Sequence, residues 1–328
     1  MRLLAGDIGG TKTDLALYAV EDEGLRELRH ARLPSGAYRD LEAMLREFLG
    51  DSPPSIDAAA FGVAGPVVGE RSRTTNLPWI VDAPALRSAL ATPRVQVVND
   101  FHALALGALT LTDDQEVILQ PGERDPDGAR AILGAGTGLG VAIVVPGPEG
   151  PRVLASEGGH VDFAPRDERE IALLRRMLAR HRRVSAERVI SGPGLREIYD
   201  LLVEDGHVAG DPALEARFEA EDPGAVIGEA AALGRSPACV EAARLFLSLL
   251  GAQAGNLALT VLPRGGLTLA GGVAPRLVPH LGADGLLASF LDKGRMRPLL
   301  ERVHVTMVTE PRVGLLGAAA LAHRLASR

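Results

Sequence analysis

Short apolar runs interrupted by glycines recur along the chain, and this pattern predicts alternating strands and helices. Runs rich in Val, Ile, Leu and Ala that stop at glycine or proline are typical of buried strands, whereas longer apolar segments with helical spacing indicate helices. In the first third, strands are expected at Leu3–Ala5, Thr13–Tyr18, Ala58–Val63 and Arg94–Val98. Helices are expected at Leu41–Leu49 and Phe101–Leu111.

The opening pattern of strand, glycine turn and strand recurs near the middle of the chain. Gly9-Gly10 separates the first two strands, and Gly134–Gly140 separates strands expected at Ala129–Leu133 and Val141–Val145. Two such units in one chain predict two related α/β domains. Their boundary is expected near residues 100–115, although no low-complexity linker marks it.

The second half of the chain is mainly helical in its pattern, with two further strands. The stretch from Glu204 to Pro237 is richer in Gly, Pro and acidic residues and is interpreted as a peripheral excursion. Helices are expected at Glu168–His181, Gly194–Val203, Ala238–Thr260 and Val313–Leu325, and strands at Leu267–Ala270 and Val303–Thr309.

Composition narrows the class of protein. A length of 328 residues favours two domains. The net charge of −7 argues against a nucleic-acid-binding surface. The single cysteine, Cys239, excludes an internal disulfide and a four-cysteine zinc site. Because no signal segment and no apolar run of about 18 residues is present, we expect a cytoplasmic protein with no membrane partner.

Glycine clusters stand where three expected strands end, at Gly6–Thr11, Gly134–Gly140 and Ala270–Gly272. Glycine lets the backbone approach a ligand closely, and successive N–H groups in such turns bind anions. Three clusters therefore predict a polyphosphate ligand. The Walker A motif is absent, because Thr11 precedes Lys12-Thr13, and the second loop does not fit the dinucleotide pattern G-x-G-x-x-G.

Several polar residues in or beside these turns can do chemistry. Asp7 can hold Mg²⁺ through water, or it can simply cap the turn. Thr11 and Thr137 can offer hydroxyls to phosphate oxygens, or they can stabilise their turns. Asp100 follows a buried strand with Asn99 and can accept a hydroxyl proton during phosphoryl transfer. A helix N-cap at Asp100 would look the same in the sequence.

A further polar group lies between residues 157 and 187. Glu157, His160 and Asp162 surround two glycines, and Glu187 follows later. Carboxylates and an imidazole can bind sugar hydroxyls through paired donors and acceptors. Metal binding is the weaker interpretation, because the two glycines predict a turn and no H-E-x-x-H motif is present.

Taken together, these segments resemble the bacterial glucokinase family of the hexokinase–actin superfamily. The order and combination of the motifs are specific, and the coverage is weakest at about 204–236. The matching motifs are GDIGGT (6–11), TNLPW (75–79), VVNDF (97–101), GAGTGLG (134–140), EGGHVDFAP (157–165), SAERVISGPGL (185–195), LAGGVAPR (269–276) and GLLGAA (314–319).

The resemblance implies a fold and a set of roles. The fold would be two ribonuclease-H-like (actin/hexokinase-type) α/β domains with a cleft between them: a small domain of residues 1–110, joined by the C-terminal helix at about 311–328, and a large domain of residues 111–310. ATP and Mg²⁺ would be used, glucose or a related hexose would be the substrate, and a homodimer is expected.

The resemblance also implies roles for individual positions. Asp100 would be the catalytic base for the sugar 6-hydroxyl. The sugar-binding residues would be Asn99, Glu157, His160 and Glu187. The nucleotide- and phosphate-binding residues would be Gly6, Asp7, Ile8, Gly9, Gly10, Thr11, Gly136, Thr137, Gly271 and Gly272.

Some residues depart from the family pattern. Lys12-Thr13-Asp14 after the first turn is closer to the repressor–kinase (ROK) sugar kinases, and Ala64-Gly65-Pro66 replaces an expected Ala-Cys-Pro. The alternatives are therefore a ROK-type kinase for another hexose, with ATP, ADP or polyphosphate as donor, or a non-catalytic sugar sensor. A transcription regulator would need an N-terminal DNA-binding segment, and the first strand begins at Leu3.

Overall fold

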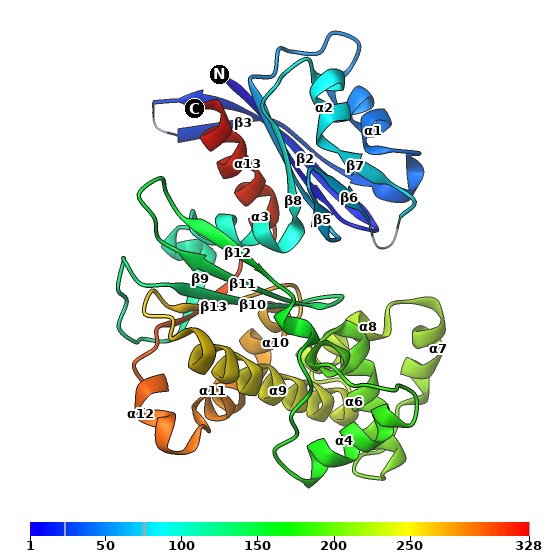
Figure 1. Cartoon of the computed structure of the whole chain (residues 1–328). Helices are drawn as coiled ribbons and strands as arrows, with labels where there is room; N and C mark the ends of the chain where they lie inside the picture. Colours follow the sequence, from blue (N-terminus) through cyan, green and yellow to red (C-terminus); the bar gives the residue numbers. More distant parts are fainter. Residues whose placement is uncertain (23, 75–76, 328) are drawn as a thin grey trace. The chain divides into compact units, whose positions relative to one another are not determined.

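The computed structural model describes residues 1–22, 24–74 and 77–327, and the chain in it forms two compact units. Unit 1 contains Met1–Asp114 together with Glu310–Arg328, and unit 2 contains Gln115–Thr309. Each unit has its own mixed sheet and its own helices (Figure 1). Thr75 and Asn76 of the TNLPW motif lie outside the described residues.

Unit 1 is built on a five-stranded sheet with the order β3-β2-β1-β4-β8. Strands β1, β2 and β3 are antiparallel neighbours, whereas β1, β4 and β8 run parallel. A small second sheet has the order β5-β6-β7. The elements are β1 (Arg2–Ile8), β2 (Lys12–Glu21), β3 (Gly24–Pro34), α1 (Leu41–Leu49), β4 (Ala58–Val63), β5 (Val67–Val68), β6 (Arg71–Arg73), β7 (Ile80–Asp82), α2 (Ala83–Leu90), β8 (Val95–Asn99), α3 (Asp100–Gly107) and α13 (Val313–Ala326).

Unit 2 repeats the same strand arrangement and adds one strand at the edge. Its order is β12-β11-β10-β13-β14-β9, in which β10, β13 and β14 run parallel and the other pairings are antiparallel. The elements are β9 (Glu116–Gln120), β10 (Arg130–Ala135), β11 (Leu139–Val145), β12 (Arg152–Ser156), α4 (Glu168–Leu178), α5 (Ala186–Val189), α6 (Gly192–Glu204), α7 (Pro212–Ala220), α8 (Pro223–Ala232), α9 (Pro237–Val261), β13 (Leu267–Ala270), α10 (Ala274–Leu281), α11 (Asp284–Leu291), α12 (Arg297–Leu300) and β14 (Val305–Val308).

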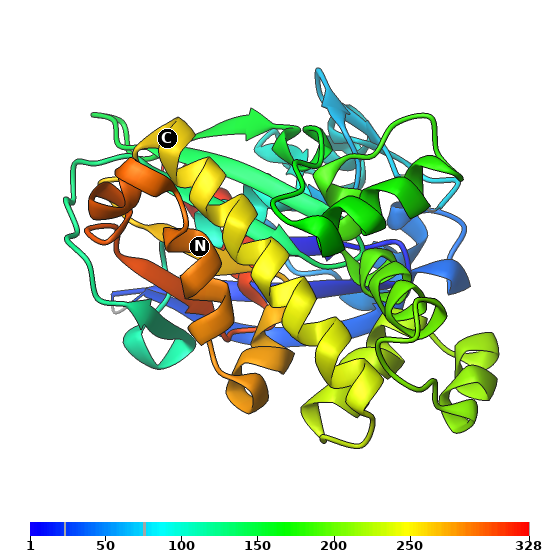
Figure 2. The same cartoon turned by 90° about the horizontal axis from the view of Figure 1, so that it is seen from below.

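The hydrophobic pattern explains where the core lies. All six side chains of β4 are buried, as expected for a central strand that is covered on both faces. In unit 2 the 25-residue helix α9 packs against α6, α8 and α11 (Figure 2). Its N-cap is Ser236, whose side chain accepts a hydrogen bond from the backbone N–H of Cys239. Cys239 is fully buried and packs in the core of unit 2.

Most of the predicted elements are present, often with shifted ends. Both predicted strand–turn–strand hairpins are confirmed as β1–β2 and β10–β11. Helix α1 and strands β4 and β13 have the predicted bounds, whereas α3 ends at Gly107 instead of Leu111. The elements without a prediction are β3, β5, β6, β7, β9, β12, α2, α5, α7, α8, α10, α11 and α12.

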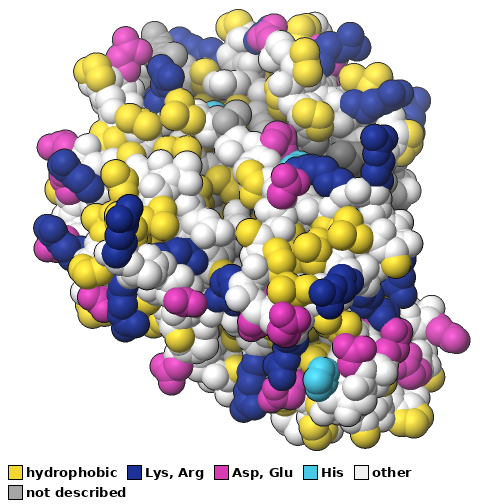
Figure 3. Space-filling model, turned by 60° about the horizontal axis from the view of Figure 1, so that its bottom comes forward, with side chains coloured by type: hydrophobic (Ala, Val, Ile, Leu, Met, Phe, Trp, Pro, Cys, Tyr) yellow, Lys and Arg dark blue, Asp and Glu magenta, His cyan; other side chains and the backbone are white. Residues whose placement is uncertain are grey.

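Helix α4 ends at Leu178, before the predicted end at His181, so the basic residues at 180–183 follow the helix. Two of the arginines among them form ion pairs. Arg180 pairs with Glu197 at 2.8 Å, and Arg183 pairs with Asp162 at 2.7 Å. Basic and acidic side chains are interspersed in the same way over the face shown in Figure 3. Among the described helices, none combines the length and apolar character that crossing a bilayer requires.

Helices α3 and α13 lie very close together within unit 1 because glycines stand at their contact. A Cβ atom on Gly317 would overlap the carbonyl oxygen of Ala103, and one on Gly107 would overlap that of Val313. On the other side of α3, a Cβ on Gly62 of β4 would lie only 2.8 Å from the Cβ of Ala103. Glycines therefore determine how α3, which begins at Asp100, lies against its neighbours.

We predict that Gly317→Ala lowers the stability of unit 1 by about 1–3 kcal/mol, because an added methyl must push two helix backbones apart. Trp79 is the single tryptophan of the chain and is buried in unit 1, so its fluorescence during urea unfolding reports on this unit. Gly36→Ala is the control, since a Cβ there meets nothing within 4 Å. Equal unfolding midpoints for the two variants would show that the helix contact tolerates the methyl.

Candidate active site

A row of polar side chains crosses the sheet of unit 1 beside the first glycine turn. Arg32 of β3 is opposite Asp14 of β2, which is opposite Asp7 of β1, and Asp7 is next to Gly62 of β4. The Asp14 carboxylate accepts hydrogen bonds from Arg32 Nε at 2.9 Å and lies 2.8 Å from His30 Nε2. Asp14 thus pairs with Arg32 and contacts His30 on the edge strand, whereas Asp7 lies further inside.

Asp7 belongs to strand β1, not to the turn in which the sequence placed it. The space around its carboxylate is tight, since a Cβ on Gly314 of α13 would lie 2.5 Å from Asp7 Oδ2. The pKa of Asp7 is raised to about 7, first because burial removes water from its carboxylate and then because Asp100 and Asp14 carry negative charge nearby. A buried carboxylate close to a second one is a suitable place for a bound cation.

The first glycine turn is closed by its own backbone and held by a side chain from outside it. The N–H of Gly9 donates to the carbonyl of Lys12 at 3.0 Å. Ser35 donates its hydroxyl to the carbonyl of Gly9 at 2.8 Å and its N–H to the carbonyl of Thr11 at 3.0 Å. Gly10 and Thr11 lie at the tip of this turn, and Thr11 is exposed. These hydrogen bonds therefore hold the turn in one conformation.

Asn99 and Asp100 stand where β8 passes into α3. Asn99 is the N-cap of α3: its Oδ1 accepts from the N–H of Phe101 at 2.9 Å, and its Nδ2 donates to the carbonyl of Gly65 at 3.1 Å. Asn99 thus occupies the N-cap position that was an alternative for Asp100, and the Phe101 N–H also donates to Asp100 Oδ1 at 2.8 Å. Asp100 is the first residue of the helix, where the helix dipole favours a carboxylate.

In unit 2 the second glycine loop occupies the equivalent place, between β10 and β11. Its tip is short, because the strands extend to Ala135 and from Leu139. The N–H of Gly192 at the start of α6 donates to the carbonyl of Gly136 at 2.8 Å. Gly271 has a φ of +87°, and a Cβ there would overlap the carbonyl of Ala135. Gly271-Gly272 directly follows β13 and therefore lies beside the second loop, at the carboxyl ends of the parallel strands β10 and β13.

Three of the predicted sugar-binding residues come together in unit 2. His160 Nδ1 lies 3.7 Å from Glu187 Oε1, and His160 Nε2 lies 3.9 Å from Glu157 Oε2. Glu157 is the most exposed of the three, at 81%, and Glu187 the least, at 32%. Thr137, His160 and Glu187 line one hollow of about 280 Å³. The hollow is thus lined by one residue of the second glycine loop and by two of the predicted sugar-binding residues.

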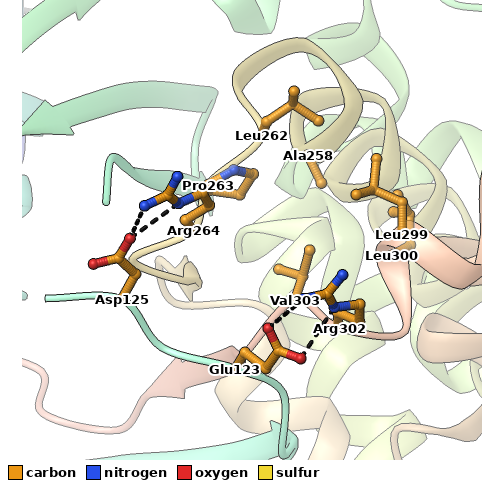
Figure 4. A pocket seen from close by; sticks show the side chains of 10 residues that line it. All are labelled: Glu123, Asp125, Ala258, Leu262, Pro263, Arg264, Leu299, Leu300, Arg302 and Val303. Atoms are coloured by element: carbon orange, nitrogen blue, oxygen red, sulfur yellow. Dashed lines mark hydrogen bonds and ion pairs between the residues drawn. The ribbon is translucent and has the colours of Figure 1, made fainter. Parts of the chain in front are cut away.

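The described residues contain no group of three or more His, Cys, Asp and Glu side chains arranged to hold a metal ion. A larger hollow of about 420 Å³ is lined by Leu262, Leu299 and other apolar residues, and none of the predicted site residues lines it (Figure 4). Both arginines described there are paired, Arg264 with Asp125 and Arg302 with Glu123. Because both arginines are already paired with carboxylates, this larger hollow is a weaker candidate for phosphate binding than the glycine loops.

Comparison with known proteins agrees with this arrangement. The glucokinase family model matches residues 4–325. A curated glucokinase from Nostoc sp. is 41% identical over 339 residues, which cover 98% of this chain and 99% of that protein. The chain belongs to the glucokinase family.

Solved structures place the fold in the same family. The crystal structure of a glucokinase from an Antarctic psychrotroph has a TM-score of 0.83 and 31% identity, with 98% of each chain covered. A ROK family glucokinase from Streptomyces griseus is more distant, with a TM-score of 0.67 and 22% identity over 99% of this chain and 100% of that one. The two-domain α/β kinase fold predicted from the sequence is confirmed.

Some residues that shape this glucokinase-family site had no role assigned from the sequence. Ser35 holds the first turn, Gly62 makes room for α3, and the backbone N–H of Leu139 binds the Glu187 carboxylate at 3.0 Å. Ser35 and Gly62 are far in sequence from the residues they serve, and Leu139 acts through its backbone. Only the strong local signal of a glycine in a buried strand, at Gly62, pointed to a close approach.

The raised pKa of Asp7 leads to a prediction about stability and pH. Its pKa is about 7 in the folded protein and 3.8 for an unperturbed aspartate, so the folded state retains the proton more strongly and stability falls as pH rises from about 4 to about 7. Asp7→Asn removes this loss. We expect the variant to match the wild type near pH 4 and to exceed it at pH 8 by an amount on the order of a few kcal/mol.

Urea unfolding followed by Trp79 fluorescence at several pH values measures this difference. The exposed Asp51 provides the matched control, Asp51→Asn, for which the difference from wild type should stay near zero at every pH. A difference between Asp7→Asn and wild type that does not change with pH would contradict the assigned environment of Asp7.

Proposed function

We propose that this protein is a glucokinase that transfers the γ-phosphate of ATP to the 6-hydroxyl of glucose, giving glucose 6-phosphate and ADP. The observation that carries the proposal is the relationship to glucokinases over almost the whole chain. The local geometry supports it, because a carboxylate at the start of a helix, two glycine turns and a group of hydroxyl-binding side chains are all present.

Asp100 is proposed as the catalytic base. The hydroxyl proton at O6 passes to the Asp100 carboxylate while O6 forms a bond to the γ-phosphorus. The bond from that phosphorus to the bridging oxygen breaks, and ADP leaves with the electron pair. Phosphoryl transfer needs little covalent help from the protein, so positioning of the two reactants supplies most of the effect.

Glucose is proposed to be held by Asn99, Glu157, His160 and Glu187. Asn99 and Asp100 belong to unit 1, whereas the other three belong to unit 2. Because Asn99 already uses both ends of its amide in the protein, it has one N–H and one lone pair left for a sugar hydroxyl.

The glycine turns are proposed to face the phosphates of ATP. Their backbone N–H groups and the hydroxyls of Thr11 and Thr137 can donate hydrogen bonds to the negatively charged phosphate oxygens. Asp7 is proposed to hold Mg²⁺ through water, which fits its buried position next to the charge of Asp100. When bound, the ion would neutralise part of the charge on the transferring phosphate.

A homodimer and a cytoplasmic location are further proposals that rest on the family resemblance and on the sequence. The negative net charge and the single buried cysteine are compatible with both. Sedimentation of the purified protein at several concentrations measures the assembly directly. A monomer at all concentrations would remove the dimer from the proposal and leave the catalytic assignment unaffected.

We predict that Asp100→Ala lowers kcat by about 10²–10⁴-fold, the usual contribution of a general base, while the protein still folds and retains part of its glucose affinity. A coupled assay of ATP consumption with glucose gives kcat, and calorimetry gives the affinity. Asp51→Ala serves as the control for loss of a surface carboxylate. If Asp100→Ala retains more than about a tenth of the wild-type kcat, Asp100 is not the base.

We also predict that His160→Ala raises the KM for glucose far more than the KM for ATP. A hydrogen bond that involves a charged group is worth about 1.5–3 kcal/mol, which corresponds to roughly 10-fold or more in KM. The exposed His207 provides the control variant His207→Ala. Equal increases in both KM values would mean that His160 does not report on the sugar.

A further inference from the structure

Glu187 has contacts on both of its carboxylate oxygens. Its Oε1 faces His160 Nδ1 at 3.7 Å, on the side of the proposed sugar site. Its Oε2 accepts a hydrogen bond from the backbone N–H of Leu139 at 3.0 Å. Leu139 is the first residue of β11, directly after the tip of the second glycine loop. One carboxylate thus touches the proposed sugar ligands and the proposed phosphate loop.

Gly138, the last residue of that loop tip, lies beside the same oxygen. A Cβ atom on Gly138 would lie 2.5 Å from Glu187 Oε2 and 3.3 Å from its carboxyl carbon. The backbone at Gly138 does not have the positive φ that would itself require glycine. The absence of a side chain at Gly138 is therefore needed for the position of Glu187, not for the backbone shape of the loop.

The elements that carry Glu187 and His160 are joined to each other and to Leu139 by backbone contacts. The N–H of Ala186 donates to the carbonyl of Val161 at 2.8 Å, so the start of α5 is fixed to the segment of His160. A Cβ on Gly159 would overlap the carbonyl of Leu139. Leu139 thus contacts both segments, with its N–H toward Glu187 and its carbonyl against Gly159.

We infer that Glu187 couples the sugar site to the phosphate loop, and that Gly138 is the positioning residue that determines where the Glu187 carboxylate lies. The inference rests on the proposed function and assigns to Gly138 a role in glucose affinity. A glucose hydroxyl that binds Glu187 Oε1 restrains the carboxylate, and the restrained Oε2 holds Leu139 and the loop. Glucose and ATP therefore favour each other's binding through one side chain, and the linkage is reciprocal.

Gly138→Ala tests this inference, because the new methyl displaces the far end of a flexible side chain and leaves the backbone allowed. We expect the Kd for glucose, measured by calorimetry without nucleotide, to rise by roughly 10-fold or more, as for loss of a hydrogen bond to a charged group. In a Glu187→Ala background the added methyl has no oxygen to displace. Gly138→Ala should then change the glucose Kd by less than about twofold.

Gly136→Ala is the matched comparison within the same loop, since a Cβ there meets nothing within 4 Å. We expect it to weaken nucleotide binding but to leave the glucose Kd measured without nucleotide unchanged. Purely general damage to the loop would raise the glucose Kd in both variants. An unchanged glucose Kd in Gly138→Ala, or the same increase with and without Glu187, overturns the inference.

Hydrogen exchange at the Leu139 amide provides a readout that needs no sugar. Protection of this amide should fall in Gly138→Ala and in Glu187→Ala, and should be retained in Glu187→Gln, whose amide oxygen can still accept the N–H. Unchanged protection in the first two variants overturns the inference. If the variants show this exchange pattern but the wild-type protein binds no glucose, the proposed function is overturned instead.

Discussion

The end of unit 1 that carries Asp7 and Asp100 depends on the absence of a side chain at Gly62. This residue stands in the middle of the sheet, beside Asp7 on one side and Val98 on the other. A Cβ there would lie 2.8 Å from the Cβ of Ala103 and 3.5 Å from the Cα of Asp100. Because Gly62 has no Cβ atom, α3 can pack closely against β4. This packing brings the Asp100 carboxylate close enough to Asp7 to raise the pKa of Asp7.

Two like charges held near each other are unfavourable in the isolated protein, and this is the physical reason why the site suits a cation. The neutral form of Asp7 is favoured by burial and by Asp100 together. A bound cation would reverse this preference, because it stabilises both carboxylates in their charged form. The stability that unit 1 gives up at neutral pH is thus connected directly with the ligand that the site is proposed to accept.

Unit 2 uses the same strand order for a different purpose. Its hairpin β10–β11 carries no carboxylate at the position of Asp7, since Ala135 ends the strand at the loop. The carboxylate comes instead from α5, where Glu187 reaches the backbone of Leu139. A repeated architecture thus supplies a glycine turn in each unit, while the groups proposed to act on the sugar are added separately by α3 in unit 1 and by α5 in unit 2.

The sequence predicted the elements that are buried on both sides or strongly periodic. Strand β4 is a continuous apolar run, and α1 has a clear apolar face, so both had the right bounds. Strand β3 was not predicted because it is an edge strand, largely exposed, whose residues from Gly24 to Pro34 are mostly polar or charged. The excursion after α6 contains α7 and α8, whose weak periodicity gave no signal.

The candidate site was predictable only in part, for a related reason. The residue types and motifs that do chemistry are visible in the chain, and resemblance to a family supplied the roles of Asp100, His160 and Glu187. The pattern of side chains along the sequence does not show which backbone atoms a residue contacts, or where a missing side chain leaves room for a neighbour. Three such features arise only when the chain folds. They are the hydrogen bond from the Leu139 N–H to Glu187, the hydrogen bond from Ser35 to the first turn, and the close approach of α3 to Gly62.

Product analysis with glucose and with 6-deoxyglucose tests the central claim most directly. With glucose, the claim predicts that each ATP consumed yields one glucose 6-phosphate. With 6-deoxyglucose, which lacks the accepting hydroxyl, it predicts competitive inhibition without phosphorylation, and ATP use close to the slow rate found without sugar. A phosphate on another hydroxyl, or ATP consumption that is equally fast without sugar, would contradict the claim.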